Sequence, residues 1–225
     1  MKTRPATAAL LLLALPLATL GFDLQGHRGA RGLAPENTLA GFEAALAVGV
    51  TTLELDTAVT RDGKVVISHD AKLNPNLTRD AQGRWLDAVG PAIFSMTLAE
   101  LQRYDVGRLA PDTKYAQTYP LQQACDGERI PTLAALFERV AAVGATQVRF
   151  NTETKLDPNE PDSTPDPAAF AQAVLNVVRE HRLESRVTLQ SFDWRSLLEV
   201  QRTAPAIATA TVPCAQAPHS SRNTR

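Results

Sequence analysis

The amino-acid sequence predicts an α/β fold built as a TIM (β/α)8-type barrel, with about six strands present and an insertion after the third strand. Three observations support this prediction. Short β-like runs alternate with helical runs from about residue 24 onward, which is typical of parallel strands joined by crossover helices. Polar and titratable residues follow successive strands. Gly-rich phosphate loops of the nucleotide-binding types are absent from the sequence.

The N-terminal part of the chain contains three predicted strands and one helix. The strands cover residues 24–26, 52–59 and 64–68, and the helix covers residues 39–48. A Pro-Glu-Asn-Thr segment at 35–38 is a suitable helix start, and Gly49 is a suitable stop. An Asp-Gly pair at 62–63 favours a tight turn between the second and third strands.

Residues 71–128 interrupt this rhythm and are predicted to form an inserted subdomain. They are rich in Asn, Pro, Gly, Asp and Gln with weak periodicity, and the segment is too long for an ordinary loop. One helix is expected at residues 98–104, because Thr97 is a suitable N-cap and Glu100 lies three residues later, as in a capping box.

The alternation resumes after the insertion. Helices are predicted at residues 133–143, 170–181 and 196–202, and strands at 147–151, 186–189 and 207–212. A loop rich in Pro and Asp separates the fourth strand from the next helix. The barrel domain is therefore expected to span residues 22–212, followed by an irregular tail at 213–225 without a core pattern.

Polar residues at the strand ends favour a barrel over an open sheet. A TIM barrel gathers the C-terminal ends of all its strands into one site, whereas an open sheet gathers only those beside its switch point. In this chain, polar residues follow or end each of the first five predicted strands. They are His27, Glu54, Asp56, His69, Glu153, Lys155 and Gln190.

Glu54 and Asp56 are predicted to form part of a metal site. Alternate residues of a strand point to the same face, so both carboxylates face inward together. Confining two carboxylates is costly unless a positive charge joins them. Glu153 supplies a third oxygen ligand, and three carboxylates without cysteine suit Ca²⁺ or Mg²⁺ better than zinc. For Glu54 and Asp56 alone, the alternative is a solvated strand end or salt bridges to basic residues.

His27 and His69 are candidates for acid–base catalysis, because two histidines beside a carboxylate–metal cluster suit proton transfer near neutral pH. Arg28 and Lys155 are candidates for binding phosphate oxygens, with structural ion pairing as the alternative. A metal, two histidines and two cations together are typical of a phosphoryl-transfer site.

These residues belong to an ordered set of motifs that resembles the glycerophosphodiester phosphodiesterase family. The motifs are Gly26-His27-Arg28-Gly29, Pro35-Glu36-Asn37-Thr38, Glu54-x-Asp56, His69-Asp70, Ile130-Pro131-Thr132-Leu133, Asn151-Thr152-Glu153-Thr154-Lys155 and Gln190-Ser191-Phe192. Each motif is weak alone, but their ordered combination over residues 24–212 is highly specific.

The resemblance implies a TIM barrel with an insertion after the third strand. It also implies hydrolysis of small-molecule glycerophosphodiesters to glycerol 3-phosphate and an alcohol, with a divalent cation. The implied roles are acid–base catalysis for His27 and His69, metal binding for Glu54, Asp56 and Glu153, and substrate binding for Arg28, Lys155 and Gln190. In some members of the family the substrate's own hydroxyl attacks first, and this chain's sequence leaves that step open.

The chain departs from the family pattern at its C-terminal end. The family barrel has eight strands, and its last strand carries an aromatic-Thr-Val-Asn-like segment that this chain lacks. We therefore expect an incomplete barrel with a truncated C-terminus. Two alternatives to an active glycerophosphodiester phosphodiesterase stay open: an inactive product of the incomplete barrel, and a related phosphodiesterase acting on lysophospholipid or phosphoinositide-type substrates.

Composition and the N-terminus indicate an exported protein. The net charge of −1 on 225 residues, without a basic stripe, gives no indication of nucleic-acid binding. Lys2 and Arg4 precede an apolar run at 8–20, which is short for a stable membrane span of about 20 residues. Residues 1–21 are therefore predicted to be a signal peptide, with an uncleaved anchor as the alternative, and the location to be periplasmic or secreted.

Two cysteines, Cys125 and Cys214, allow one disulfide or two free thiols.

Overall fold

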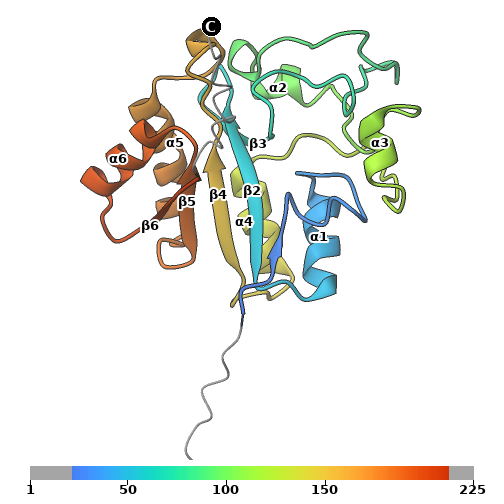
Figure 1. Cartoon of the computed structure of the whole chain (residues 1–225). Helices are drawn as coiled ribbons and strands as arrows, with labels where there is room; N and C mark the ends of the chain where they lie inside the picture. Colours follow the sequence, from blue (N-terminus) through green and yellow to red (C-terminus); the bar gives the residue numbers. More distant parts are fainter. Residues whose placement is uncertain (1–21, 213–225) are drawn as a thin grey trace, which may run out of the picture.

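The computed structural model describes residues 22–212, which form a curved sheet flanked by helices and a long insertion (Figure 1). The strands are β1 (Gln25–Gly26), β2 (Thr52–Val59), β3 (Val65–Ile67), β4 (Arg149–Thr154), β5 (Val187–Ser191) and β6 (Ala208–Thr211). The α-helices are α1 (Leu39–Val48), α2 (Leu98–Leu101), α3 (Lys114–Thr118), α4 (Leu133–Ala142), α5 (Pro167–Glu180) and α6 (Trp194–Thr203). Single 3₁₀ turns occur at η1 (Ile93–Ser95) and η2 (Pro161–Ser163).

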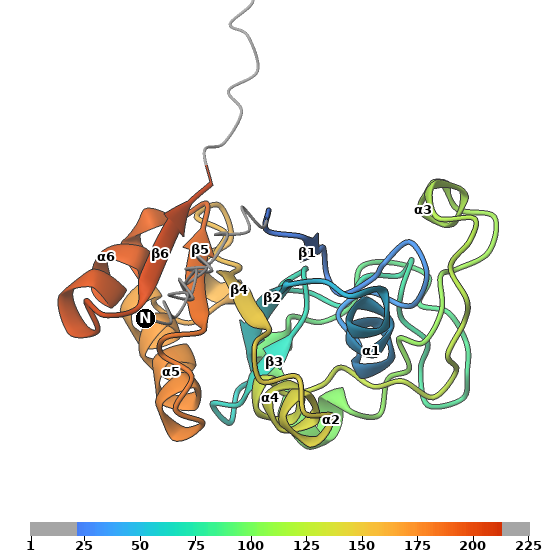
Figure 2. The same ribbon diagram turned by 90° about the horizontal axis from the view of Figure 1, so that it is seen from below.

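Five strands run parallel in the order β1-β2-β4-β5-β6, and each connection between them passes through a helix. This confirms the predicted α/β class, its strand number and the barrel-type arrangement. Within residues 22–212, β1 and β6 are the edge strands and do not pair with each other, so the sheet is an open arc (Figure 2). In the same view α4, α5 and α6 lie along the outer, convex face of that arc.

The register of the sheet separates polar from apolar side chains. Leu53 pairs with Phe150, and Phe150 pairs with Val187, so these three side chains point to one face. One residue further along each strand, Glu54, Asn151 and Thr188 form a row on the opposite face. The apolar face meets the helices, and the polar face lines the inside of the arc.

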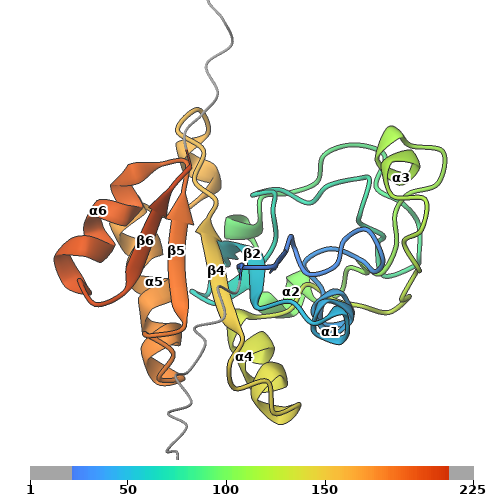
Figure 3. The same cartoon turned by 60° about the horizontal axis from the view of Figure 1, so that its bottom comes forward.

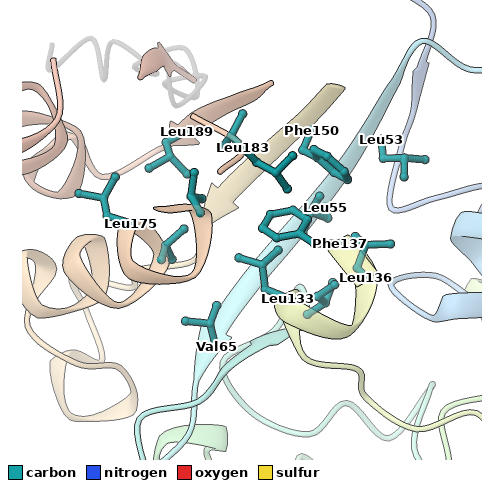
Figure 4. Close-up of a cluster of buried hydrophobic side chains, with 14 of the residues drawn as sticks. Leu53, Leu55, Val65, Leu133, Leu136, Phe137, Phe150, Leu175, Leu183 and Leu189 are labelled. Atoms are coloured by element: carbon teal, nitrogen blue, oxygen red, sulfur yellow. The ribbon is translucent and has the colours of Figure 1, made fainter. Parts of the chain in front are cut away.

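The apolar face and the helices form the main core, which Figure 4 shows in close-up. Phe137 of α4 meets Phe150 of β4 edge to face, with ring centroids 4.7 Å apart. Leu133 and Leu136 of α4 are fully buried beside them, because residues three and four apart share one helix face. The helices are thus fixed by burial of their apolar stripe against the sheet.

Local signals set the ends of the first helix. The Thr38 hydroxyl accepts a hydrogen bond from the Gly41 amide, and Gly49 closes the helix with a left-handed φ of 90°. Helix α1 therefore has the predicted bounds. Helices α5 and α6 begin earlier than predicted, at Pro167 and Trp194, because Asp166 and Asp193 act as N-caps.

Strand β3 corrects one expectation. The predicted alternation implied a parallel third strand, but β3 pairs antiparallel with β2, joined through the turn at 60–64. Because the chain reverses, the end of β3 returns to the middle of β2: Ile67 lies opposite Thr57, and the Ser68 amide donates to the Asp56 carbonyl at 2.9 Å. His69 therefore reaches the inner face by a hairpin and not as a barrel-strand end.

Strands β4 and β5 are longer than predicted at their C-terminal ends. The apolar pattern stops near Phe150 and Leu189, but the hydrogen-bonded ladder continues to Thr154 and Ser191. Glu153 and Gln190 consequently lie within strands, not after them. Glu153 and Gln190 in these extensions are polar because they line the inner face. Thr154 is polar on the opposite face, where its hydroxyl lies 2.8 Å from that of Ser196 on α6, and the apolar periodicity of the sequence reports neither side.

The insertion between β3 and α4 lies on the β1 side of the sheet, opposite α5 and α6 (Figure 3). It contains η1, α2 and α3, and its second apolar cluster includes Leu73, Ile93 and Leu101. Helix α2 has the predicted capping box between Thr97 and Glu100 but ends at Leu101, three residues early. Helix α3 was not predicted.

Some predictions fall outside the described residues. The signal peptide at 1–21, the tail at 213–225 and Cys214 lie there, whereas Cys125 is partly buried in the insertion. Among residues 22–212, no helix is both long enough and apolar enough to span a bilayer.

Replacing Phe150 with Ala tests the sheet–helix core. Phe150 is 1% exposed and packs against Phe137, so Phe150→Ala is expected to lower the free energy of unfolding by about 3–5 kcal/mol. Phe22→Ala is the matched control, because Phe22 is 80% exposed and its removal is expected to cost under about 0.5 kcal/mol. Urea unfolding followed by circular dichroism measures both, and equal effects would contradict the described core.

Candidate active site

Three buried carboxylates converge on the inner face of the sheet. Glu54 and Asp56 lie two residues apart on β2, and Glu153 of β4 pairs directly with Asp56. Glu54, Asp56 and Glu153 are 6%, 1% and 5% exposed, and one carboxylate oxygen from each lies within 4.8 Å of the others. The sheet register alone therefore brings together the three predicted metal ligands.

This grouping opposes ionisation of Glu54 and Glu153. Burial, followed by the neighbouring Asp56 charge, raises the pKa of Glu54 to about 8. Burial also raises the pKa of Glu153, although Lys155 partly offsets the rise. Like charges in a buried site repel unless a cation joins them.

The cluster fits a divalent cation on its own chemistry. All three donors are carboxylate oxygens, which hard cations prefer, and the three are close enough to share one ion. The raised pKa values of Glu54 and Glu153 indicate that the nearby Arg28 and Lys155 side chains do not fully offset the burial and mutual repulsion of the carboxylates. Such an ion would relieve the repulsion between the carboxylates.

The loop between β1 and α1 wraps one side of the cluster. Arg28 has a left-handed φ of 54°, and its amide donates to Glu54 Oε2 at 2.8 Å. Glycine is required beside it: a Cβ on Gly29 would lie 2.7 Å from the Gly41 carbonyl carbon, and φ at Gly29 is 81°. Arg28 is not a glycine, so its left-handed conformation is strained, as is often the case for residues at functional sites.

The Arg28 guanidinium lies between two acids. Its Nη1 donates to Glu36 Oε1 at 2.8 Å, and its Nε lies 3.3 Å from Asp56 Oδ2. Burial lowers the pKa of Arg28, but the charges of Glu36 and Asp56 outweigh burial and raise it. Asn37, also on this loop, donates from Nδ2 to Asp56 Oδ2 at 3.0 Å.

Lys155 and Gln190 hold the other side of the cluster. Lys155 Nζ donates to Glu153 Oε1 at 2.8 Å and lies 3.7 Å from Asp56 Oδ1. Gln190 Nε2 donates to Glu54 Oε1 at 3.3 Å and to Glu153 Oε2 at 3.4 Å. Gln190 thus links acids from two different strands.

The two histidines lie in different surroundings. His27 Nε2 is 3.8 Å from Glu54 Oε2, and its side chain is half exposed. Burial, then the positive charges of Arg31 and Arg28, lower the pKa of His27, which favours a neutral ring at neutral pH. His69 enters from the end of the β3 hairpin and is partly buried.

Asp70 and Asn74 fix the His69 ring. His69 Nδ1 lies 2.8 Å from Asp70 Oδ1, and Asn74 Nδ2 donates to Asp70 Oδ2 at 2.6 Å. Burial opposes ionisation of Asp70, but the hydrogen bonds from His69 and Asn74 outweigh it and lower the pKa of Asp70. An ionised Asp70 accepts the Nδ1 proton and leaves Nε2 as the reactive nitrogen.

A groove of about 570 Å³ opens beside His69 and Lys155. One wall comes from the start of the insertion and includes Asp70 and Asn74, and the other comes from the segment after β4. A salt bridge of 2.6 Å between Lys72 and Glu160 joins the two walls. The groove therefore opens to solvent beside His69 and beside Lys155, whose Nζ binds Glu153 of the cluster.

The structure brings the eight predicted site residues into one neighbourhood, and it adds five that the sequence analysis did not assign. The additional residues are Glu36, Asn37, Asp70, Asn74 and Tyr115, whose contacts orient Arg28, Asp56 or His69. Glu36, Asn37 and Asp70 stand inside motifs already singled out, so the motif match was the available signal. Asn74 and Tyr115 lie in the insertion, where the sequence offered none.

Comparisons with known proteins match this chain to one protein family. The model of the glycerophosphoryl diester phosphodiesterase family matches residues 27–223. A glycerophosphodiester phosphodiesterase of Caldanaerobacter subterraneus is 30% identical over 183 residues, covering 80% of this chain and 61% of the relative. This chain spans 56–63% of the length of that relative and two from Bacillus subtilis.

Two crystal structures resemble the fold. A protein of Silicibacter pomeroyi assigned as a glycerophosphoryl diester phosphodiesterase is 38% identical, with a TM-score of 0.78 over 89% of this chain and 68% of that one. An Oleispira antarctica phosphodiesterase in complex with the product sn-glycerol-3-phosphate is 27% identical, with a TM-score of 0.62 over 84% of this chain and 65% of that one.

The pKa of Glu54 predicts a pH-dependent stability in the absence of divalent cations. Because Glu54 holds its proton to about pH 8 when folded but releases it near pH 4.5 when unfolded, stability falls as pH rises between these values. Glu54→Gln removes this loss. We expect it to stabilise the chelator-treated protein at pH 8 by on the order of 2 kcal/mol, and less at pH 5.5.

Thermal melts in chelator at pH 5.5 and pH 8 measure this difference. Glu180→Gln is the control, because Glu180 is an exposed carboxylate at the end of α5. The same pH dependence in both variants would show that Glu54 does not titrate as described.

Proposed function

Because the chain belongs to the glycerophosphoryl diester phosphodiesterase family, we propose that it hydrolyses glycerophosphodiesters to glycerol 3-phosphate and an alcohol. The observation that carries this proposal is the buried carboxylate cluster flanked by two histidines and two cationic side chains. The product complex of the Oleispira antarctica protein supports a small-molecule substrate that contains glycerol phosphate.

We propose that Glu54, Asp56 and Glu153 hold Ca²⁺ or Mg²⁺. When bound, such an ion supplies positive charge that stabilises negative charge on phosphate oxygens. Gln190 keeps Glu54 and Glu153 oriented through its two hydrogen bonds.

Arg28 and Lys155 orient the phosphate in this proposal. The two cations lie beside different oxygens of Asp56: Arg28 Nε is near Oδ2, and Lys155 Nζ is near Oδ1. A phosphate at the cluster therefore meets a cation on each side. Fixed positive charge of this kind lowers the energy of the transition state without reorganisation of solvent.

His27 and His69 carry the proton transfers in this proposal. The lowered pKa of His27 keeps its ring neutral, which suits removal of a proton from the attacking hydroxyl, whether of water or of the substrate. His69 gives its Nε2 proton to the departing alcohol oxygen, and Asp70 stabilises the cationic ring before that transfer. Over one turnover His27 gains one proton and His69 loses one, so the number of protons on the two rings together does not change.

The groove beside His69 is proposed to receive the alcohol group. It starts at the histidine that would protonate that group and continues past Lys155 to solvent. Apolar residues such as Leu156 and Val89 lie along it with the polar ones. This mixed lining keeps a lysophospholipid or phosphoinositide-type substrate as the alternative.

We also propose export to the periplasm or the medium, on the strength of the N-terminal segment 1–21.

Hydrolysis of glycerophosphocholine tests the function directly. The purified chain is expected to release glycerol 3-phosphate, to stop when a chelator is added, and to recover when Ca²⁺ or Mg²⁺ is restored. His69→Ala is expected to lower kcat by about 10²–10⁴-fold, because it removes a general acid.

His181→Gln serves as the matched control, since His181 contacts the Val177 carbonyl at the end of α5 and no residue of the cluster. A chain that melts cooperatively but hydrolyses only lysophosphatidylcholine or phosphatidylinositol would support the alternative substrate class. No hydrolysis of any of these, with a cooperative melt, would reject the proposed function.

Replacing Asp70 with Asn tests the orientation of His69. The Asn side chain keeps the size of Asp70 but supplies no charge for the imidazolium, so kcat is expected to fall by about 10–100-fold while KM changes little. The pH dependence of kcat distinguishes a loss of orientation from a folding defect. The fall in kcat at high pH, where the general acid has lost its proton, would shift to lower pH in the variant. An unchanged profile would remove Asp70 from the mechanism.

A further inference from the structure

Tyr115 connects the insertion to the arginine of the active site. It lies on α3, and its hydroxyl donates to Glu36 Oε2. The other oxygen of that carboxylate, Oε1, accepts from Arg28 Nη1 at 2.8 Å. Arg28 Nη1 also lies 3.5 Å from the Tyr115 hydroxyl. One carboxylate is thus shared between a tyrosine of the insertion and the arginine beside Asp56.

Helix α3 is attached to the body by few apolar contacts. None of its residues is buried, and it contributes no side chain to either apolar cluster. Figure 2 shows it at the outer end of the insertion, away from the sheet. Besides Tyr115, polar contacts tie this region to the β1–α1 loop, including Gln122 to the Arg31 carbonyl at 2.7 Å.

The Tyr115 contact also limits how Glu36 can bind Arg28. An arginine and a carboxylate tend to pair through two parallel hydrogen bonds, which would occupy two guanidinium nitrogens. Here Oε2 of Glu36 faces the Tyr115 hydroxyl and Oε1 faces the guanidinium, so Glu36 is turned to bind Nη1 alone. Among the described residues, no hydrogen bond involves Arg28 Nη2. That donor therefore stays available for a ligand oxygen.

Tyr115 is suited to this task over a wide pH range. Burial and the adjacent Glu36 charge raise the pKa of Tyr115, so its hydroxyl keeps its proton and acts as a donor. Glu36 is 7% exposed, which makes an unpaired carboxylate oxygen costly there. Without the tyrosine hydroxyl, Glu36 would satisfy its second oxygen by turning to Arg28.

We propose that Tyr115 is a positioning residue: by occupying one oxygen of Glu36, it keeps Arg28 Nη2 free to bind a phosphate oxygen of the substrate. The insertion thereby sets the phosphate affinity of the site. This inference rests on the proposed function, because it assigns the phosphate contact to Arg28.

Tyr115→Phe removes the hydroxyl and keeps the ring. We expect KM for glycerophosphocholine and Kd for sn-glycerol 3-phosphate to rise about five- to tenfold, with kcat within about twofold of wild type. Tyr119→Phe is the matched control: Tyr119 meets the Tyr115 ring at 5.3 Å, but its hydroxyl makes no hydrogen bond among residues 22–212. Its KM and Kd are expected to stay at the wild-type values.

The Glu36→Gln variant tests whether Tyr115 acts on Arg28 through Glu36. In Glu36→Gln the side chain is neutral and has only one acceptor oxygen, so it cannot hold Arg28 as a charged fork. Adding Tyr115→Phe to it is therefore expected to change Kd by less than about twofold. A merely structural role of Tyr115 would weaken binding equally in both backgrounds, and that result would overturn the inference.

Other outcomes separate the inference from the proposed function. An active wild-type chain whose KM and Kd do not change in Tyr115→Phe rejects the positioning role alone. A folded wild-type chain that neither hydrolyses glycerophosphodiesters nor binds sn-glycerol 3-phosphate rejects the proposed function, and the positioning role with it. Thermal melts of each variant show that the comparison is made between folded proteins.

Discussion

Electrostatic repulsion among three buried carboxylates is the constraint on which the rest of the site depends. Glu54, Asp56 and Glu153 share one face of a parallel sheet and are almost fully buried. Each is contacted by a donor or a cation from a different part of the chain, including the Arg28 amide and Lys155 Nζ. These partners reduce the repulsion but do not remove it, as the raised pKa values of Glu54 and Glu153 indicate. A divalent cation is the addition that this arrangement favours.

The sheet can hold such a charged face because its other face is covered by helices. On β2, β4 and β5, apolar residues whose side chains point away from the acids pack with α4, α5 and α6 into one apolar cluster. Burial of that face provides the free energy that keeps the strands in register. A slip by one residue would exchange the two faces and bury the acids under the helices, so the same register specifies both the core and the site.

The segments around the sheet supply chemistry that the parallel strands alone do not. The β1–α1 loop places Arg28 and Asn37 against Asp56, and the β3 hairpin carries His69 back to the same level. The insertion adds contacts that orient these groups, through Asn74 on the side of His69 and Tyr115 on the side of Arg28. Arg28, which lies beside Asp56, is therefore contacted by a residue far away in the sequence, whereas His69 is fixed by its near neighbours.

The sequence by itself determined the class of fold and most elements, because these follow from local signals, and it singled out the eight candidate site residues that the structure brings together. The β-like run at residues 52–59 predicted β2, and the Pro-Glu-Asn-Thr segment with Gly49 predicted both ends of α1. Tertiary structure decided what local signals do not encode. It set the antiparallel direction of β3, the polar ends of β4 and β5, and the contacts of Tyr115. Strand direction, ladder length and contacts across about 80 residues are fixed by pairing and packing between distant segments, so short-range periodicity cannot report them.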